Sequence, residues 1–101
     1  MARRAFMMRL KPGCEAIYKE KHDQIWPELV DQIHRSGTRN YSIFRRGLDL
    51  FAYLETDQPA PPGPADDEVL HRWWRMMEPY MEYHDDHTPK TWDMEEAFHL
   101  D

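Results

Sequence analysis

The order in which strand-like and helix-like patterns follow one another constrains the fold of this chain most strongly. Apolar residues alternate with a period of two in some stretches and recur every three to four residues in others, which are the patterns of strands and helices. From the N-terminus the order is strand, helix, strand, strand, helix, strand. Such a split pair of βαβ units predicts an α+β, ferredoxin-like domain, with a four-stranded antiparallel sheet and both helical segments on one face.

The predicted boundaries follow from proline and glycine. Pro27 removes a backbone donor and disfavours helical geometry at Trp26, so we expect the first helical segment to kink there or to restart as a second short helix, which Gly37 caps. Pro79 is expected to weaken the last turn of the later helix. The predicted strands cover residues 3–11, 38–46, 48–56 and 91–100. The first helical segment covers residues 14–26 and continues over 27–35. The later helix follows Ala65 and carries Asp66, Asp67 and Glu68 in its first turn.

Two stretches are expected to be irregular. Residues 58–64 are rich in proline and predict a stiffened loop, and residues 83–90 predict a polar loop. The second loop contains His84-Asp85-Asp86-His87, which looks like a metal cluster. Ligands this close together rarely surround one ion without partners from elsewhere, and the chain has no other spacing typical of a zinc site, so we expect a solvated loop.

Length and charge narrow the class of protein. A chain of 101 residues forms one domain (residues 1–101) with a modest core, so dimerisation would help to stabilise it. The net charge of −6 argues against binding to nucleic acid. The first fifty residues hold ten Lys and Arg against six Asp and Glu, and the rest hold three against thirteen. This asymmetry either helps two subunits to meet or reflects two differently solvated faces.

Cysteine usage and hydropathy indicate the compartment. The single Cys14 excludes an internal disulfide, and no run of signal-peptide type precedes Gly13. No stretch has the length and apolar character of a membrane span. We therefore expect a cytoplasmic protein that works in a reducing environment, away from membranes.

One titratable residue lies within an apolar helical stripe. Tyr18, His22, Ile25, Leu29 and Ile33 recur at spacings of three and four residues, so they share one inward face. A histidine in such a stripe is often a core residue with a satisfied hydrogen bond. Tyr18, one turn earlier, adds a second polar ring to the same face, so the two side chains could bind one ligand.

Aromatic residues elsewhere could converge on this histidine. Trp73 and Trp74 are adjacent on a helix and point about 100° apart, and they either pack in the core or line a pocket. In a ferredoxin-like fold the inner faces of the helices meet one face of the sheet, so both tryptophans, Tyr41, Tyr18 and His22 could line one cavity. Indoles stack on the CH faces of sugars while phenol and imidazole bond to hydroxyls, so the set is typical of a polyol site.

Motifs along nearly the whole chain resemble one family. They are Ala5-Phe6-Met7-Met8, Tyr18 with His22, Ile25-Trp26-Pro27-Glu28-Leu29, Gly37, Asn40-Tyr41-Ser42-Ile43, Arg72-Trp73-Trp74, and Phe98 with Leu100. Together these motifs resemble those of the L-rhamnose mutarotases.

The resemblance implies an activity, a site and an assembly. It implies an isomerase that interconverts the α and β anomers of L-rhamnose or a related 6-deoxy sugar, without a metal or an organic cofactor. It implies that His22 is the general acid and that Tyr18, Tyr41, Trp73 and Trp74 bind the sugar. It also implies a homodimer, in which two ferredoxin-like subunits pair through their sheets into a dimeric α/β barrel.

Two other classes of function stay open from the sequence. A non-catalytic module that binds small sugars would use the same aromatic pocket, with His22 only as a hydrogen-bond partner. A protein similar to the dimeric-barrel oxygenases would use the same fold, although the sequence indicates no haem or oxygenase substrate site. Fold alone does not separate these alternatives.

Overall fold

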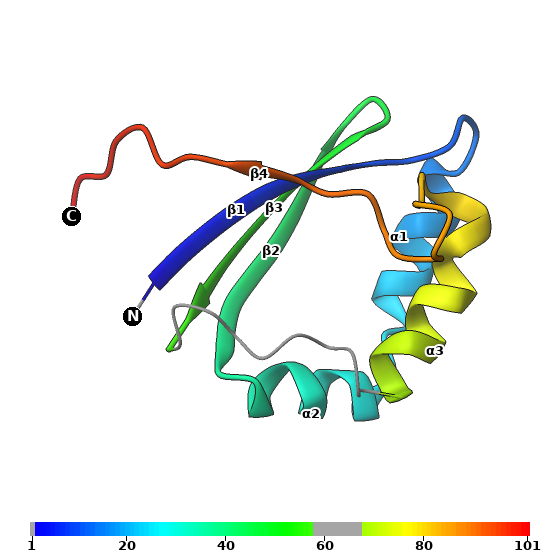
Figure 1. Ribbon diagram of the computed structural model, residues 1–101, viewed down its shortest axis with the longest axis horizontal. Helices are drawn as coiled ribbons and strands as arrows, with labels where there is room; N and C mark the ends of the chain where they lie inside the picture. Colours follow the sequence, from blue (N-terminus) through cyan, green and yellow to red (C-terminus); the bar gives the residue numbers. More distant parts are fainter. Residues whose placement is uncertain (1, 58–67) are drawn as a thin grey trace.

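The predicted order of elements is confirmed by a computed structural model, which describes residues 2–57 and 68–101 (Figure 1). The predicted loop at residues 58–64, together with Asp66 and Asp67, lies outside the described residues. The elements are β1 (Ala2–Arg9), α1 (Glu15–Asp23), α2 (Pro27–Arg35), β2 (Thr38–Arg46), β3 (Asp49–Thr56), α3 (Glu68–Met77), the 3-10 turn η2 (Glu78–Tyr80) and β4 (Trp92–Met94).

The four strands form one antiparallel sheet in the order β2-β3-β1-β4. Helices α1, α2 and α3 all lie on one side of this sheet, as expected for a ferredoxin-like α+β fold (Figure 1). We call the side toward the helices the inner face and the opposite side the outer face. No helix within residues 2–57 and 68–101 is long and apolar enough to cross a bilayer.

The core fills the space between the inner face and the helices. Every second residue of β3 is buried, as expected for a strand with one face turned toward a core. Aliphatic, aromatic and methionine side chains from the strands, helices and the segment after η2 contribute to one cluster. Its buried members are Phe6, Met8, Leu10, Tyr18, Leu29, Leu50, Ala52, Leu54, Trp73, Met77 and Met81.

Proline divides the first helical segment as predicted, but α1 is shorter than the predicted 14–26. It ends at Asp23, where the backbone N–H groups of Gln24 and Ile25 donate to carbonyls of the last turn. Trp26 is extended, with φ −66° and ψ 133°, because Pro27 excludes helical geometry there and begins α2. Gly37 ends α2 with φ +84°, a left-handed conformation that glycine adopts without steric cost.

Strand β2 contains one irregularity that matters for the site. Thr38 pairs with Thr56 and Ile43 pairs with Ala52, so five steps along β2 match four along β3. The extra residue forms a bulge at Asn40, whose φ is +50°. Because the bulge shifts the alternation by one residue, Tyr41 falls on the inner face together with Ile43.

The prediction for the last strand was wrong in length. Only Trp92–Met94 pairs with β1, whereas the alternation predicted a strand over residues 91–100. Alternation marks a segment that can lie against a sheet, but a strand also needs a neighbouring backbone to bond. After Met94 the chain leaves the ladder, and Phe98 and Leu100 are 79% and 80% exposed.

Candidate active site

Helix α1 places Tyr18 and His22 one turn apart, on the side that faces the sheet. Their ring centroids lie 4.2 Å apart at an interplanar angle of 31°. Nδ1 of His22 lies 3.0 Å from the backbone carbonyl oxygen of Tyr18. Because a carbonyl only accepts, Nδ1 carries the proton and donates it, and Nε2 is the acceptor in the neutral ring.

The charge state of His22 follows from its surroundings. Burial of the half-buried ring lowers the pKa of His22, while the hydrogen bond to Tyr18 and the nearby charge of Asp23 oppose this effect. Desolvation disfavours the charged form of an imidazole, and here it outweighs the two opposing influences. The neutral form therefore predominates at pH 7.

Two indoles continue the cluster of rings. Trp73, in α3, meets His22 edge to face with 5.3 Å between ring centroids, and Trp26 meets Trp73 in the same way at 5.2 Å. Trp73 is 7% exposed, so it belongs to the core as well as to the histidine's surroundings. The participation of Trp26 was not predicted from the sequence. The available signal was Pro27, which fixes the residue before it in an extended conformation.

Three phenols converge on the same region. Burial is the main reason that the pKa of Tyr18 is raised, and the neighbouring phenols of Tyr41 and Tyr83 raise it further. Burial also raises the pKa of Tyr41, although 39% of the residue as a whole is exposed. The two observations agree if the phenol oxygen lies inward and the backbone side of the residue outward. All three phenols keep their protons at pH 7 and are hydrogen-bond donors.

Tyr83 joins this region to the polar loop and was not among the predicted site residues. Its hydroxyl donates to the backbone carbonyl of Trp74 at 2.7 Å, and burial is the main cause that raises the pKa of its phenol. An aromatic residue at the start of an otherwise polar loop was the only signal in the sequence. The hydrogen bond ties the loop to the helix that carries the two tryptophans.

The structure does not bring Trp74 into the ring cluster around His22. Its ring lies against that of His71, with 5.5 Å between centroids. Neighbouring positions on a helix point about 100° apart, so Trp73 and Trp74 face different surroundings. Trp74 instead borders a cavity of about 480 Å³ whose other lining residues are His71, Arg75, Glu78, Asp86, His87 and Thr88.

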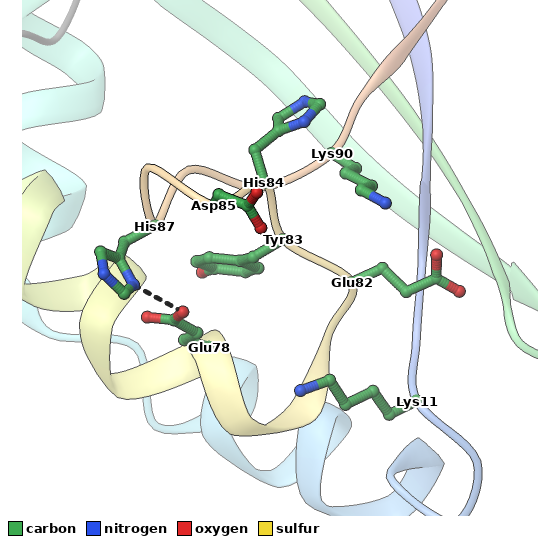
Figure 2. A pocket seen from close by; sticks show the side chains of 8 residues that line it. All are labelled: Lys11, Glu78, Glu82, Tyr83, His84, Asp85, His87 and Lys90. Carbon is green, nitrogen blue, oxygen red and sulfur yellow. Dashed lines mark hydrogen bonds and ion pairs between the residues drawn. The ribbon is translucent and has the colours of Figure 1, made fainter.

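A second cavity, of about 360 Å³, lies beside the polar loop (Figure 2). Its lining residues are Lys11, Glu78, Glu82, Tyr83, His84, Asp85, His87 and Lys90. His87 pairs with Glu78 at 2.8 Å, and this hydrogen bond raises the pKa of His87. Within residues 2–57 and 68–101, no three His, Cys, Asp or Glu side chains are placed to hold a metal ion.

Comparison with known proteins gives one consistent result. The family model described as L-rhamnose mutarotase matches residues 3–100. An L-rhamnose mutarotase of Bacillus subtilis (strain 168) is 40% identical over 107 residues, which cover 100% of both chains. An L-rhamnose mutarotase of Jannaschia sp. (strain CCS1) is 39% identical over 103 residues, which cover 99% of both chains.

Solved structures agree with these matches. The crystal structure of an L-rhamnose mutarotase from Formosa agariphila superimposes over 100% of both chains, with a TM-score of 0.92 and 34% identity. Tetracenomycin F2 cyclase from Streptomyces glaucescens, with a TM-score of 0.54 and 19% identity, shares the fold alone. The match over nearly the whole length, at this level of identity, shows that the chain belongs to the L-rhamnose mutarotase family.

Proposed function

We propose that the cluster around His22 is the site at which this chain, an L-rhamnose mutarotase, interconverts the α and β anomers of L-rhamnose or a related 6-deoxy sugar. The proposal rests on the hydrogen bonding of the His22 ring. Its Nδ1 is held by the Tyr18 carbonyl at 3.0 Å, so one nitrogen, Nε2, remains for exchange with a ligand among the surrounding rings.

Mutarotation needs two proton transfers at one end of the sugar. The bond between C1 and the ring oxygen breaks, its electron pair stays on the ring oxygen, and that oxygen takes a proton. The anomeric hydroxyl gives its proton to solvent water and becomes the carbonyl oxygen of the open chain, and water returns this proton when the ring closes. Protonated Nε2 of His22 supplies the first proton and takes it back when the ring closes on the other face, which is general acid–base catalysis without a cofactor.

The phenols and indoles hold the sugar. Because the pKa values of Tyr18 and Tyr41 are raised, both hydroxyls donate hydrogen bonds to the sugar and neither is the base for the anomeric proton. Trp73 offers an apolar surface beside His22. We extend the proposal to Trp74 on the resemblance alone, since its ring lies against His71, outside the cluster around His22. An indole accepts the C5 methyl of a 6-deoxy sugar without the desolvation cost of a hydroxymethyl.

We also propose that the protein is a cytoplasmic homodimer that packs through its outer faces. Four apolar residues stand opposite one another across all four strands: Phe44, Phe51, Met7 and Trp92. Phe44 is 68% and Trp92 is 46% exposed, which is unusual for large apolar side chains on one face of a sheet. The free thiol of Cys14 suits a reducing compartment.

Saturation-transfer NMR tests the activity. Irradiation of the α-anomer proton of L-rhamnose should reduce the β-anomer signal only when the protein is present. L-Mannose, which carries a hydroxymethyl where L-rhamnose has a methyl, is the matched control and should exchange more slowly. A protein that binds L-rhamnose without accelerating exchange would be a sugar-binding module, and the mutarotase proposal would be wrong.

A further inference from the structure

The hydroxyl of Tyr83 differs from the other two phenols near His22 in its hydrogen bonding. It donates to the backbone carbonyl of Trp74 at 2.7 Å. In the part of the chain that the structure describes, the hydroxyls of Tyr18 and Tyr41 have no hydrogen-bond partner. A phenol carries one proton, and its oxygen can also accept. Tyr18 and Tyr41 can therefore donate to a ligand, whereas Tyr83 can only accept a hydrogen bond from one.

A backbone hairpin, residues 82–90, fixes the direction of the Tyr83 side chain. The N–H of Lys90 donates to the carbonyl of Glu82 at 3.0 Å. Tyr83 and Pro89 form an antiparallel bridge one step further along. The ring of Tyr83 packs against the core, and its hydroxyl is held by the last turn of α3. A side chain held at both ends loses little conformational entropy when a ligand binds, so Tyr83 is a preorganised acceptor.

Tyr83 reaches both the ring cluster around His22 and open space. Its phenol is near enough to that of Tyr18 to raise the pKa of Tyr18, and the ring of Tyr18 lies 4.2 Å from that of His22. The half-buried side chain of Tyr83 also borders the cavity of about 360 Å³ beside the hairpin (Figure 2). Tyr83 therefore lies at the boundary of the proposed sugar site, where a ligand can reach it.

A buried sugar needs acceptors as well as donors. Each of its hydroxyls carries a proton, and a buried proton without an acceptor costs free energy. The indole N–H of Trp73 only donates, and Nε2 of His22 accepts only while the ring is neutral. Tyr83 supplies a further acceptor. Its own donation to the Trp74 carbonyl polarises the oxygen and strengthens it as an acceptor.

We propose that Tyr83 is a further sugar-binding residue, whose oxygen accepts a hydrogen bond from one hydroxyl of the sugar held beside Tyr18 and His22. The inference rests on the proposed mutarotase function and adds a contact to that site. The sugar hydroxyl donates to Tyr83 and Tyr83 donates to the carbonyl of Trp74, so one chain of hydrogen bonds links the sugar to α3. The hairpin of residues 82–90 is then part of the sugar site.

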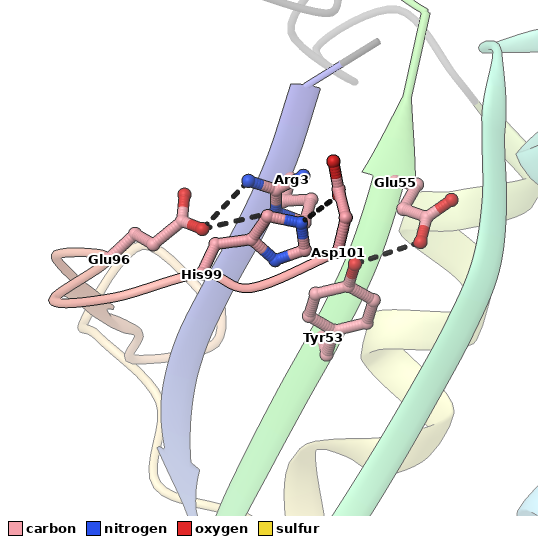
Figure 3. Close-up of polar contacts among 6 residues, drawn as sticks. All are labelled: Arg3, Tyr53, Glu55, Glu96, His99 and Asp101. Carbon is pink, nitrogen blue, oxygen red and sulfur yellow. Dashed lines mark hydrogen bonds and ion pairs between the residues drawn. The ribbon is translucent and has the colours of Figure 1, made fainter.

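Removal of one oxygen tests the contact first. Tyr83→Phe keeps the ring and its packing, so the variant should fold. Its KM for L-rhamnose should rise about threefold to tenfold, as expected for the loss of one neutral hydrogen bond, with kcat close to wild type. Tyr53→Phe is the matched control and should leave KM unchanged. The Tyr53 hydroxyl also donates, at 2.8 Å, but its acceptor is Glu55 on the outer face (Figure 3).

Derivatives of L-rhamnose that lack one hydroxyl each, at C1, C2, C3 or C4, give an independent test. NMR titration measures their dissociation constants with wild type and with Tyr83→Phe. In wild type, the derivative without the bonded hydroxyl should bind about threefold to tenfold more weakly than L-rhamnose. In Tyr83→Phe it should bind nearly as well as L-rhamnose, because its partner is already absent. A residue that only ties the hairpin to α3 would weaken L-rhamnose and every derivative by the same factor.

The outcomes separate this contact from the proposed function. An unchanged KM in Tyr83→Phe overturns the contact. Affinities of the derivatives, relative to L-rhamnose, that are the same in wild type and Tyr83→Phe also overturn it. A wild type that binds L-rhamnose without accelerating exchange overturns the proposed function, and the titrations, which measure binding alone, still decide the contact. A wild type that does not bind L-rhamnose overturns both.

Discussion

Burial and one backbone hydrogen bond act in opposite directions on the imidazole of His22. Burial lowers its pKa, whereas the bond from Nδ1 to the Tyr18 carbonyl favours the charged ring. The net effect leaves a neutral ring at pH 7 whose tautomer is fixed and whose protonated form is a minor species and a stronger acid than an ordinary imidazolium. A general acid of this kind gains acid strength and loses population as its pKa falls.

We expect the rate of anomer exchange to fall as pH rises. If protonated His22 is the acid, its fraction drops about tenfold per pH unit above its pKa, which lies below the ordinary value of about 6.5. NMR exchange rates from about pH 5 to about pH 8.5, corrected for the rate without protein, measure this profile. A rate that instead rises over the same range would make His22 the base.

The same lowered pKa predicts how His22 affects stability. The unfolded chain binds a proton at His22 more readily than the folded chain, so the stabilisation by the neutral ring is present above pH ~6.5 and is lost as pH falls through the folded pKa. The slope for one group is at most about 1.4 kcal/mol per pH unit. Urea denaturation of wild type and His22→Asn at several pH values isolates this contribution.

His87 changes the pH dependence of stability in the opposite direction to His22. The stability of the wild type must therefore be compared with that of His22→Asn at each pH. The pKa of His87 is raised by Glu78, and its stabilisation is present at low pH and lost as pH rises through the folded pKa. Because His87 is common to both proteins, it cancels in the difference. Parallel pH profiles for wild type and His22→Asn would contradict a lowered pKa at His22.

Part of this site could be predicted from the sequence, because the spacing of residues along a helix determines which of them share one face. Tyr18 and His22 are four residues apart, and the structure sets their rings in contact. Trp26 and Tyr83 could not be predicted in this way. Both lie outside the helices, and their positions depend on a proline break and on a loop hydrogen bond to Trp74.

Strand β2 shows how one irregular residue sets the direction of the side chain that follows it. The bulge at Asn40 restores the inner-face alternation after Arg39, so the phenol of Tyr41 reaches the region of Tyr18. Asn40 tolerates the left-handed conformation, and its side-chain amide donates to Glu55 at 2.9 Å. Bulges are common beside functional sites because they re-aim side chains in this way.

Substitution of Asn40 should separate backbone conformation from the side-chain bond. Asn40→Ala should lower the free energy of unfolding by about 1 kcal/mol, because alanine resists a positive φ. Asn40→Gly loses the same amide but accepts the conformation, so it should cost less in urea denaturation. Equal losses in both variants would assign the effect to the bond with Glu55 and not to the bulge.

Most of the remaining elements follow from periodicity and from proline and glycine, as the bounds of α2 and β2 show. The last strand does not, because residues 91–100 alternate correctly but pair only over Trp92–Met94. Side-chain pattern reports which face a segment can present, whereas pairing depends on a free neighbouring backbone.

The two faces of the sheet carry different kinds of side chain. The inner face supplies the core and the surroundings of His22, and the outer face exposes the row of Phe44, Phe51, Met7 and Trp92. A small domain has little core to stabilise it, so burial of this row in the proposed dimer would add stability through association.

The melting temperature should therefore depend on protein concentration. Dilution favours the monomer, and a dimer linked to folding melts at a lower temperature when dilute. Phe44→Glu/Trp92→Glu should abolish the dependence by placing charge on the outer face. Ala16→Glu, an exposed position on α1, adds a like charge away from the sheet and should retain it. A wild-type melting temperature that is constant over a hundredfold dilution would contradict the dimer.

Replacement of His22 by Asn gives the decisive comparison for catalysis. Asparagine keeps a hydrogen-bond donor for the Tyr18 carbonyl but cannot titrate near neutral pH. On one preparation of His22→Asn, anomer exchange of L-rhamnose should fall by about 10²–10⁴-fold, while melting temperature and sugar affinity stay close to wild type. Full exchange activity in that folded protein would contradict the assignment of His22 as the acid.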